Sequence, residues 1–266
     1  AYAMDRHFET APLHENLPVV SALLAFWYRQ YGASPSTAVV PYSQDLSLFP
    51  AYLQQLYMES LGKSMSREGA ALPFKTSEII WGSAGTNGQH SYFQQLHQGT
   101  EFTPVEFIAC ATASVDGGDE RHRQLLANCL SQSMALMNGD ETSADVGADN
   151  WEPQKTIAGN RPSTTLLLEQ LTPQNLGALI ALYEHKVFAL SVLWNINAFD
   201  QWGVELGKRL SKEVYAALSE SAGSLSNQEN IEAAASVESA SSLDASTRAL
   251  VQKISMSGFR ARIQAV

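Results

Sequence analysis

The sequence has little cysteine and no secretion signal. Its two cysteines, Cys110 and Cys129, form no CxxC pair, so a disulfide framework is not expected. Such sparse cysteine use is typical of a protein kept in a reducing compartment, and we expect a cytoplasmic location. The N-terminus has no basic stretch followed by an apolar run, so no signal peptide is predicted.

The sequence also has few basic residues. Lys and Arg number 17 against 27 Asp and Glu, which gives a net charge of −10. This balance argues against nonspecific nucleic-acid binding, which needs a basic face. The apolar segment 187–196 has only about half the length of a membrane span. We therefore expect a soluble protein with neither nucleic acid nor membrane as its partner.

Signatures of cofactors are missing as well. No glycine-rich nucleotide motif occurs, so neither NAD nor ATP is expected and we predict no cofactor. His90, Gln94 and His97 line up if residues 87–98 form one helix, but their spacing matches no zinc pattern. We predict no metal site.

What the sequence does contain is an alternation of helix-like and apolar strand-like segments. Helices are expected at 16–31, 46–60, 87–98, 119–137 and 172–195, and strands at 37–41, 78–81, 103–112 and 163–169. This order is typical of a parallel sheet covered by helices on both faces. It predicts an α/β fold, a three-layer α/β/α sandwich with a mainly parallel sheet.

The C-terminal part has a different composition. We expect residues 1–196 to form the α/β/α domain and residues 197–266 to form a helical arm. Within that arm, residues 219–242 are rich in Ser, Ala and Glu and are expected to be an exposed or mobile insertion. A last helix is predicted over 243–254, with Ser242 or Asp244 as its cap. Residues 139–154 are acidic and predicted to form a loop.

One polar stretch begins the arm, Phe199 to Lys208 (FDQWGVELGK). It is predicted to start a helix, with Asn197 or Asp200 as the N-cap. Gln201 and Lys208 lie two turns apart on one face of that helix, with Glu205 between them. For an arbitrary helix, a solvated flank would be the ordinary interpretation.

The sequence of residues 199–208 resembles the C-terminal signature of glucose-6-phosphate isomerases. Residues 54–60 (QQLYMES) resemble the catalytic-glutamate helix of that family, and residues 85–90 (GTNGQH) resemble its catalytic-histidine turn. Residues 4–8 and 159–162 also match, in consistent order. The resemblance extends to about residue 218, although Leu61 stands where the family usually has Asn.

The resemblance implies both a fold, an α/β/α layer of sugar-isomerase type, and an isomerisation reaction. Family members interconvert glucose 6-phosphate and fructose 6-phosphate in glycolysis and gluconeogenesis, by ring opening and proton transfer through a cis-enediol. They are homodimers whose active site is shared between subunits. Their phosphate loop and a catalytic arginine precede the matched motifs, so we expect this chain to be a C-terminal half that is inactive alone.

The base of this reaction is predicted to be Glu59, at the end of its helix. The alternative is an ordinary solvated carboxylate, which is the usual state of a helix-end glutamate. Gln55 lies four residues earlier on the same face, and the family uses the matching glutamine to bind the sugar. An exposed helix glutamine with no function is the alternative for Gln55.

The resemblance assigns ring opening to His90 and Lys208. A histidine shuttles a proton to the ring oxygen, and a lysine ammonium stabilises developing oxyanion charge. Gln201 is implied as a substrate or phosphate contact. The alternatives are a histidine that only fills space and a surface lysine that pairs with Glu205.

A second function class shares this fold: a sugar-phosphate-binding sensor that does not catalyse. A pure sensor needs no carbon base. The presence of Glu59, His90 and Lys208 together therefore favours the enzyme.

Overall fold

The computed structural model describes residues 1–113, 119–140, 153–224 and 243–256. The chain divides into two compact units, Ala1–Asp200 and Gln201–Val266. The boundary thus lies a few residues after the predicted one at 196. The expected insertion and the acidic loop fall largely on residues 225–242 and 141–152, which lie outside the described residues.

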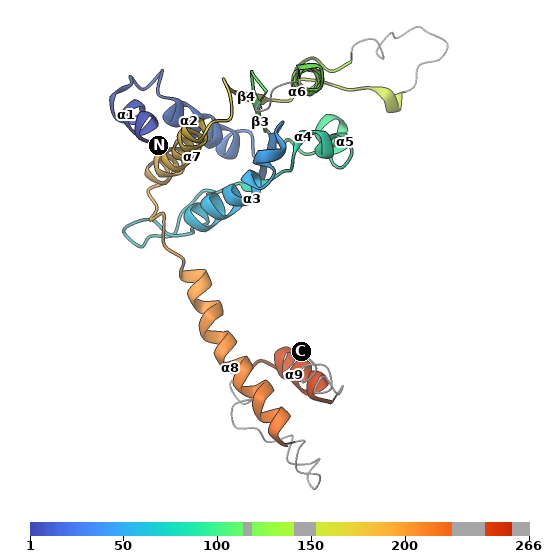
Figure 1. Ribbon diagram of the computed structural model, residues 1–266. Coiled ribbons are helices and arrows are strands. Elements are labelled where there is room, and N and C mark those ends of the chain that lie inside the picture. The colour runs from blue at the N-terminus through green and yellow to red at the C-terminus, as the bar shows by residue number, and fades with distance from the viewer. Residues whose placement is uncertain (114–118, 141–152, 225–242, 257–266) are drawn as a thin grey trace. The chain divides into compact units, whose positions relative to one another are not determined.

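The first unit is built on four parallel strands, and Figure 1 labels β3 and β4 among its helices. Their order is β2-β1-β3-β4, and every neighbouring pair is parallel. The strands are β1 (Ser36–Pro41), β2 (Ile79–Trp81), β3 (Val105–Cys110) and β4 (Ser163–Leu168). The predicted parallel sheet is confirmed, with each strand inside or within one residue of its expected range.

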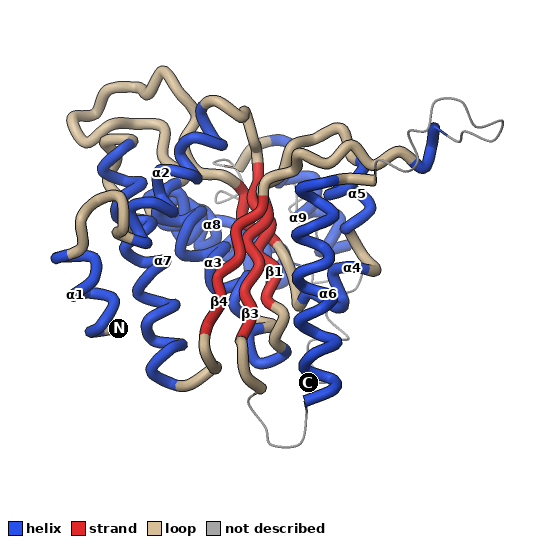
Figure 2. Tube along the Cα trace, turned by 90° about the horizontal axis from the view of Figure 1, so that it is seen from above, coloured by secondary structure: helices blue, strands red, loops and turns tan. Residues whose placement is uncertain are grey.

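Helices cover both faces of this sheet (Figure 2). One face carries α1 (Tyr2–Thr10), α2 (Leu17–Gln30), α3 (Phe49–Gln54), the π-helical η2 (Gln55–Glu59) and α7 (Pro173–Leu193). The other carries α4 (Gly85–Gln89), α5 (Phe93–Gln98) and α6 (Asp119–Asn138).

Alternating strand residues supply the two cores between these layers. Val39 and Ile108 belong to the cluster formed with α2, α3 and α7. Val40 and Phe107 belong to the cluster formed with α5 and α6. Successive side chains of a strand point to opposite faces, so near-continuous apolar strands are buried on both sides. The three-layer α/β/α architecture is confirmed.

Helix α7 is longer and more apolar than the segment 187–196 suggested. Its 21 residues have a mean hydropathy of 1.5 in the most apolar window, so the helix passes a length and composition test for a membrane span. Leu179, Val187 and Leu190 are nevertheless buried in the core of the first unit. The physical role of α7 is that of a core helix. It starts as predicted, because the Thr172 hydroxyl accepts the Asn175 N–H at 3.1 Å.

The helix predicted over 87–98 is wrong. The chain instead forms α4 and α5, separated at residues 90–92. Tyr92 leaves helical geometry with φ −137°, and its hydroxyl accepts the Ser83 N–H at 3.1 Å. The Ser91 hydroxyl also donates to the Asn87 carbonyl at 3.1 Å, a local bond that competes with helix continuation.

The second unit contains α8 (Trp202–Ser224) and α9 (Ala245–Met256). Residues 219–224, expected in the insertion, continue α8. Asp244 caps α9, since its carboxylate accepts the N–H groups of Ser246 at 2.9 Å and Thr247 at 3.0 Å. The two helices pack through a small apolar cluster that includes Ala217, Leu243 and Val251.

The core of the first unit contains a buried charged network. The Lys186 ammonium donates to Glu106 and lies over the rings of Tyr57 and Tyr183, 5.6 and 5.4 Å from their centroids. The Tyr183 hydroxyl donates to the other Glu106 oxygen at 2.7 Å. Glu78 is 3% exposed, and its burial raises the pKa of that carboxyl.

Removing the cation from this network is expected to destabilise the protein strongly. Lys186→Met keeps the apolar stem but leaves the buried Glu106 without its cationic partner, which costs about 3–5 kcal/mol of unfolding free energy. Arg6→Met is the control, because its pair with Glu9 is exposed and such pairs are worth about 0.2–1 kcal/mol. Urea denaturation followed by circular dichroism measures both. Equal small losses would contradict a structural role for the buried pair.

Candidate active site

The parallel topology decides at which edge of the sheet each candidate residue lies. Strands β1 and β2 are parallel neighbours, so the connection between them returns from the carboxyl end of β1 to the amino end of β2. Helices α3 and η2 form part of this return. The end of η2 therefore lies toward the amino edge of the sheet, whereas α4 follows the carboxyl end of β2.

Glu59 is the last residue of η2 and is partly buried. It belongs to a π turn, a rare distortion that is frequent at functional sites. The helix ends two residues later, at Leu61, one residue past the predicted end. A Cβ at position 62 would lie 2.5 Å from the Met58 carbonyl oxygen. The chain leaves the helix so close to this carbonyl that only glycine fits there. Gln55 opens the same π turn and is exposed.

Hydrogen bonds confirm that the end of this helix lies at the amino edge. The Thr76 hydroxyl, just before β2, donates to the Lys63 carbonyl at 2.7 Å. Arg67 Nε donates to the Ile196 carbonyl at 3.1 Å, in the segment that follows α7. Because β4 leads into α7, which packs back along the sheet, the end of α7 also lies at this edge.

His90 lies at the opposite edge. It is the C-cap of α4, not a first-turn residue as expected, and its side chain is exposed. Gly85 fixes the start of α4 against Tyr42, directly after β1, since a Cβ there would lie 2.3 Å from the Tyr42 ring. Gln89 also donates to the Tyr42 hydroxyl at 3.0 Å. Glu59 and His90 of one chain are therefore not brought together.

The break between α4 and α5 also separates His90 from the histidine with which it was expected to align. His97 lies in α5 and shares a hydrogen bond of 2.9 Å with Gln132. Among the residues that the structure describes, no group of three His, Cys, Asp or Glu side chains is arranged to hold a metal ion.

Gln201 and Lys208 belong to the second unit. Helix α8 begins at Trp202, and the Gln201 carbonyl accepts the N–H of Glu205 at 3.1 Å. Gln201 therefore occupies the capping position that was predicted for Asn197 or Asp200. Lys208 donates to Glu205 at 2.8 Å, and its side chain is 63% exposed. This is the pairing expected of a surface lysine, so the geometry alone assigns it no chemistry.

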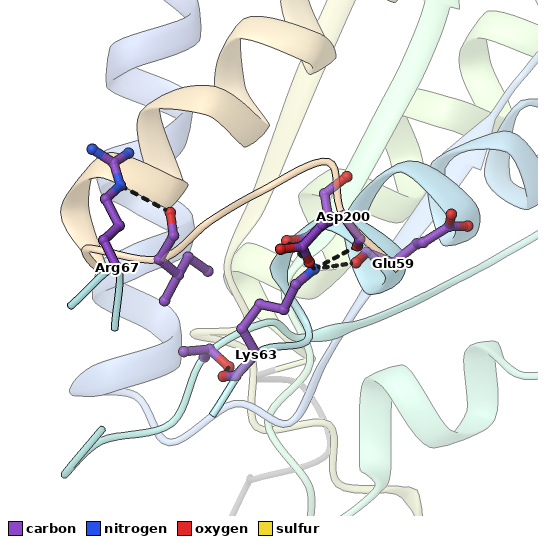
Figure 3. A network of polar contacts seen from close by, with 7 residues as sticks. Glu59, Lys63, Arg67 and Asp200 are labelled. Atoms are coloured by element: carbon purple, nitrogen blue, oxygen red, sulfur yellow. Dashed lines mark hydrogen bonds and ion pairs between the residues drawn. The ribbon is translucent and has the colours of Figure 1, made fainter. Parts of the chain in front are cut away.

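The sequence interpretation missed Lys63. Its ammonium contacts the backbone of Glu59 and the carboxylate of Asp200, as the close-up shows (Figure 3). The Glu59 carboxylate points away from this ammonium. A signal was present in the sequence, because a basic residue just past a helix end commonly binds the last carbonyls.

Comparisons with known proteins agree with these motifs. A model of phosphoglucose isomerase matches residues 1–251. The chain belongs to the phosphoglucose isomerase family. The match includes all five candidate residues, in both structural units.

Individual relatives are named glucose-6-phosphate isomerase. The chain is 52% identical over 235 residues to a glucose-6-phosphate isomerase of Methylibium petroleiphilum, covering 80% of this chain and 43% of the relative. It is 54% identical over 214 residues to one of Polaromonas naphthalenivorans, covering 80% and 39%. The chain thus spans less than half the length of these family members.

A solved structure shares the fold. A glucose-6-phosphate isomerase from Chlamydia trachomatis superimposes with a TM-score of 0.75 at 47% identity. The match covers 83% of this chain and 42% of that one. The α/β fold of the phosphoglucose isomerase family is therefore present in the part of the chain that the structure describes.

Proposed function

We propose that this chain supplies the proton-transfer residues of a glucose-6-phosphate isomerase. The reaction is the reversible conversion of glucose 6-phosphate to fructose 6-phosphate. The observation that carries the proposal is the family match over residues 1–251, which includes the motifs of Glu59, His90 and Lys208 in one chain. No cofactor is required, because the substrate's own carbons exchange one proton.

Glu59 is the proposed base. Its carboxylate takes the proton from C2 of the open-chain aldose, which leaves a cis-enediolate. The proton of the C2 hydroxyl passes to the C1 oxygen, and Glu59 returns a proton to C1 to give the ketose. Its position at the end of a partly buried helix supports this role.

His90 and Lys208 are the proposed ring-opening residues. The imidazole of His90 carries a proton toward the ring oxygen, and the ammonium of Lys208 stabilises the oxyanion that develops on opening. Gln55 and Gln201 are proposed to hydrogen-bond the sugar phosphate. The roles of Gln201 and Lys208 rest on the family motif alone.

The proposed assembly is a homodimer with active sites shared between subunits. Its support is that Glu59 and His90 of one chain lie at opposite edges of the same sheet. A site that uses both therefore needs the histidine of a second copy. Closed two-fold dimers are the commonest oligomers and present each shared element twice.

The overall charge of −10 opposes binding of a phosphate dianion. Local donors must therefore supply the phosphate contacts. The alternative function, a sensor that binds sugar phosphate without turning it over, would need the same donors but no base.

One experiment separates these functions in a full-length protein that carries this sequence. A coupled assay follows glucose 6-phosphate formed from fructose 6-phosphate, and calorimetry follows binding. Turnover supports the isomerase. Binding of both sugar phosphates without turnover would instead establish the sensor.

A further inference from the structure

Lys63 occupies a junction between two chain segments that are distant in the sequence. Its ammonium donates to the carbonyl oxygens of Glu59 at 2.7 Å, Ser60 at 3.0 Å and Asp200 at 2.9 Å (Figure 3). It also forms an ion pair of 3.1 Å with an Asp200 carboxylate oxygen. A lysine ammonium has three N–H donors, so its bonding capacity is used within the protein.

The segment held by Lys63 has an unfavourable backbone. Phe199 adopts a φ of +67°, a region that bulky L-residues rarely occupy. Such a conformation persists only where surrounding contacts enforce it. Lys63 binds Asp200, the residue after Phe199. Arg67 supplies further contacts, since its N–H donates to the Asn195 carbonyl at 2.9 Å.

We propose that Lys63 is a positioning residue for the isomerisation. Its ammonium fixes the position of the Glu59 backbone relative to the strained segment that ends immediately before Gln201. This inference rests on the proposed function. Lys63 is not proposed as a catalytic residue, because its donors bind backbone carbonyls and the Glu59 carboxylate points away from it.

The positive charge of Lys63 is essential to this role. The last carbonyls of a helix carry partial negative charge, and the Asp200 carboxylate adds a full one. The Lys63 side chain is 17% exposed and that of Asp200 is 32% exposed. If the ammonium were lost, water would therefore replace its hydrogen bonds only in part. A neutral side chain would leave the carbonyls unsatisfied and release both segments.

The test begins with Lys63→Met in a full-length enzyme that carries this sequence. Kinetic constants are measured with glucose 6-phosphate. We expect kcat to fall by about 10- to 100-fold, because a small misplacement of a base costs that much. KM should change far less than kcat, since the lost interaction acts mainly in the transition state.

Three further variants distinguish positioning from general stability. Lys63→Arg keeps the charge and several donors, and should recover most of the lost kcat. Asp200→Asn removes the ion pair but keeps the backbone carbonyl, and should give a smaller fall in kcat. Lys75→Met is the matched control, because Lys75 is exposed on the same connection and its loss should leave kcat unchanged.

Amide hydrogen exchange on this chain provides a readout that needs no activity. In Lys63→Met, amides at 60–62 and 197–201 should exchange about tenfold faster or more, with the core strands unaffected. The inference is overturned if their exchange is unchanged, or if exchange rises while kcat stays at the parental value. A parent enzyme with no isomerase activity would overturn the proposed function instead.

Discussion

Replacing Glu59 with Gln is expected to lower kcat by about 10²- to 10⁴-fold, the usual contribution of a general base. Glutamine keeps the shape of the side chain and its hydrogen-bonding ability, but it does not accept the C2 proton. KM should remain close to the parental value, because the lost interaction acts in the transition state. The measurement is steady-state kinetics on a full-length enzyme that carries this sequence.

Glu9→Gln is the matched control for this variant. Among the described residues, the Glu9 side chain pairs with Arg6 at the surface, and 67% of it is exposed. Its substitution changes the net charge by the same amount as Glu59→Gln. A kcat within about twofold of the parent is expected for this control, since exposed pairs contribute little. Equal kcat values for Glu59→Gln and the parent would remove Glu59 from the mechanism.

Mixing two inactive variants is expected to restore activity. One protein carries His90→Ala and the other carries Glu59→Gln. If the histidine comes from the partner subunit, each mixed dimer has one site with both residues intact and one site with both replaced. Random exchange in a two-fold dimer then gives roughly a quarter of the parental activity.

The expected recovery follows from the positions of the two residues. Glu59 lies toward the amino edge of the sheet, whereas His90 follows the carboxyl end of β2. Subunit exchange is monitored independently with two affinity tags. Mixed dimers that stay as inactive as the separate variants would place His90 in the site of its own subunit.

Most of the first unit was predictable from the sequence because local signals and tertiary burial agree. The two central strands, β1 and β3, are apolar and buried on both faces, as strands of a covered parallel sheet must be. Thr172 and Pro173 give a conventional start to α7, and Asp244 does the same for α9. At these places, capping and hydrophobic pattern favour the same structure.

The structure differs from the sequence predictions where a nonlocal contact overrides a local pattern. The break between α4 and α5 depends on the Tyr92 hydroxyl reaching Ser83, a contact that helix periodicity does not encode. Helix α8 starts at Trp202 because the chain before it turns through the strained Phe199. The sequence shows good capping residues at 197 and 200, but not which of them the turn leaves outside the helix.

Family motifs in the sequence suggest the residues of the candidate site, but not their arrangement. The separation of Glu59, His90 and Lys208 between sheet edges and structural units follows only from topology. Lys63 was missed although a basic residue follows the helix end, because its contact with Asp200, 137 residues further along the chain, is not encoded locally.

Solvent deuterium is the most direct test of the central claim, that isomerisation proceeds by proton transfer through Glu59. The full-length enzyme is incubated with fructose 6-phosphate in heavy water, and the product is analysed by NMR. We predict deuterium at C2 of glucose 6-phosphate for the parent, with this incorporation lost in Glu59→Gln. Isomerisation without any deuterium in the product, or incorporation by Glu59→Gln at the parental rate, would contradict the mechanism.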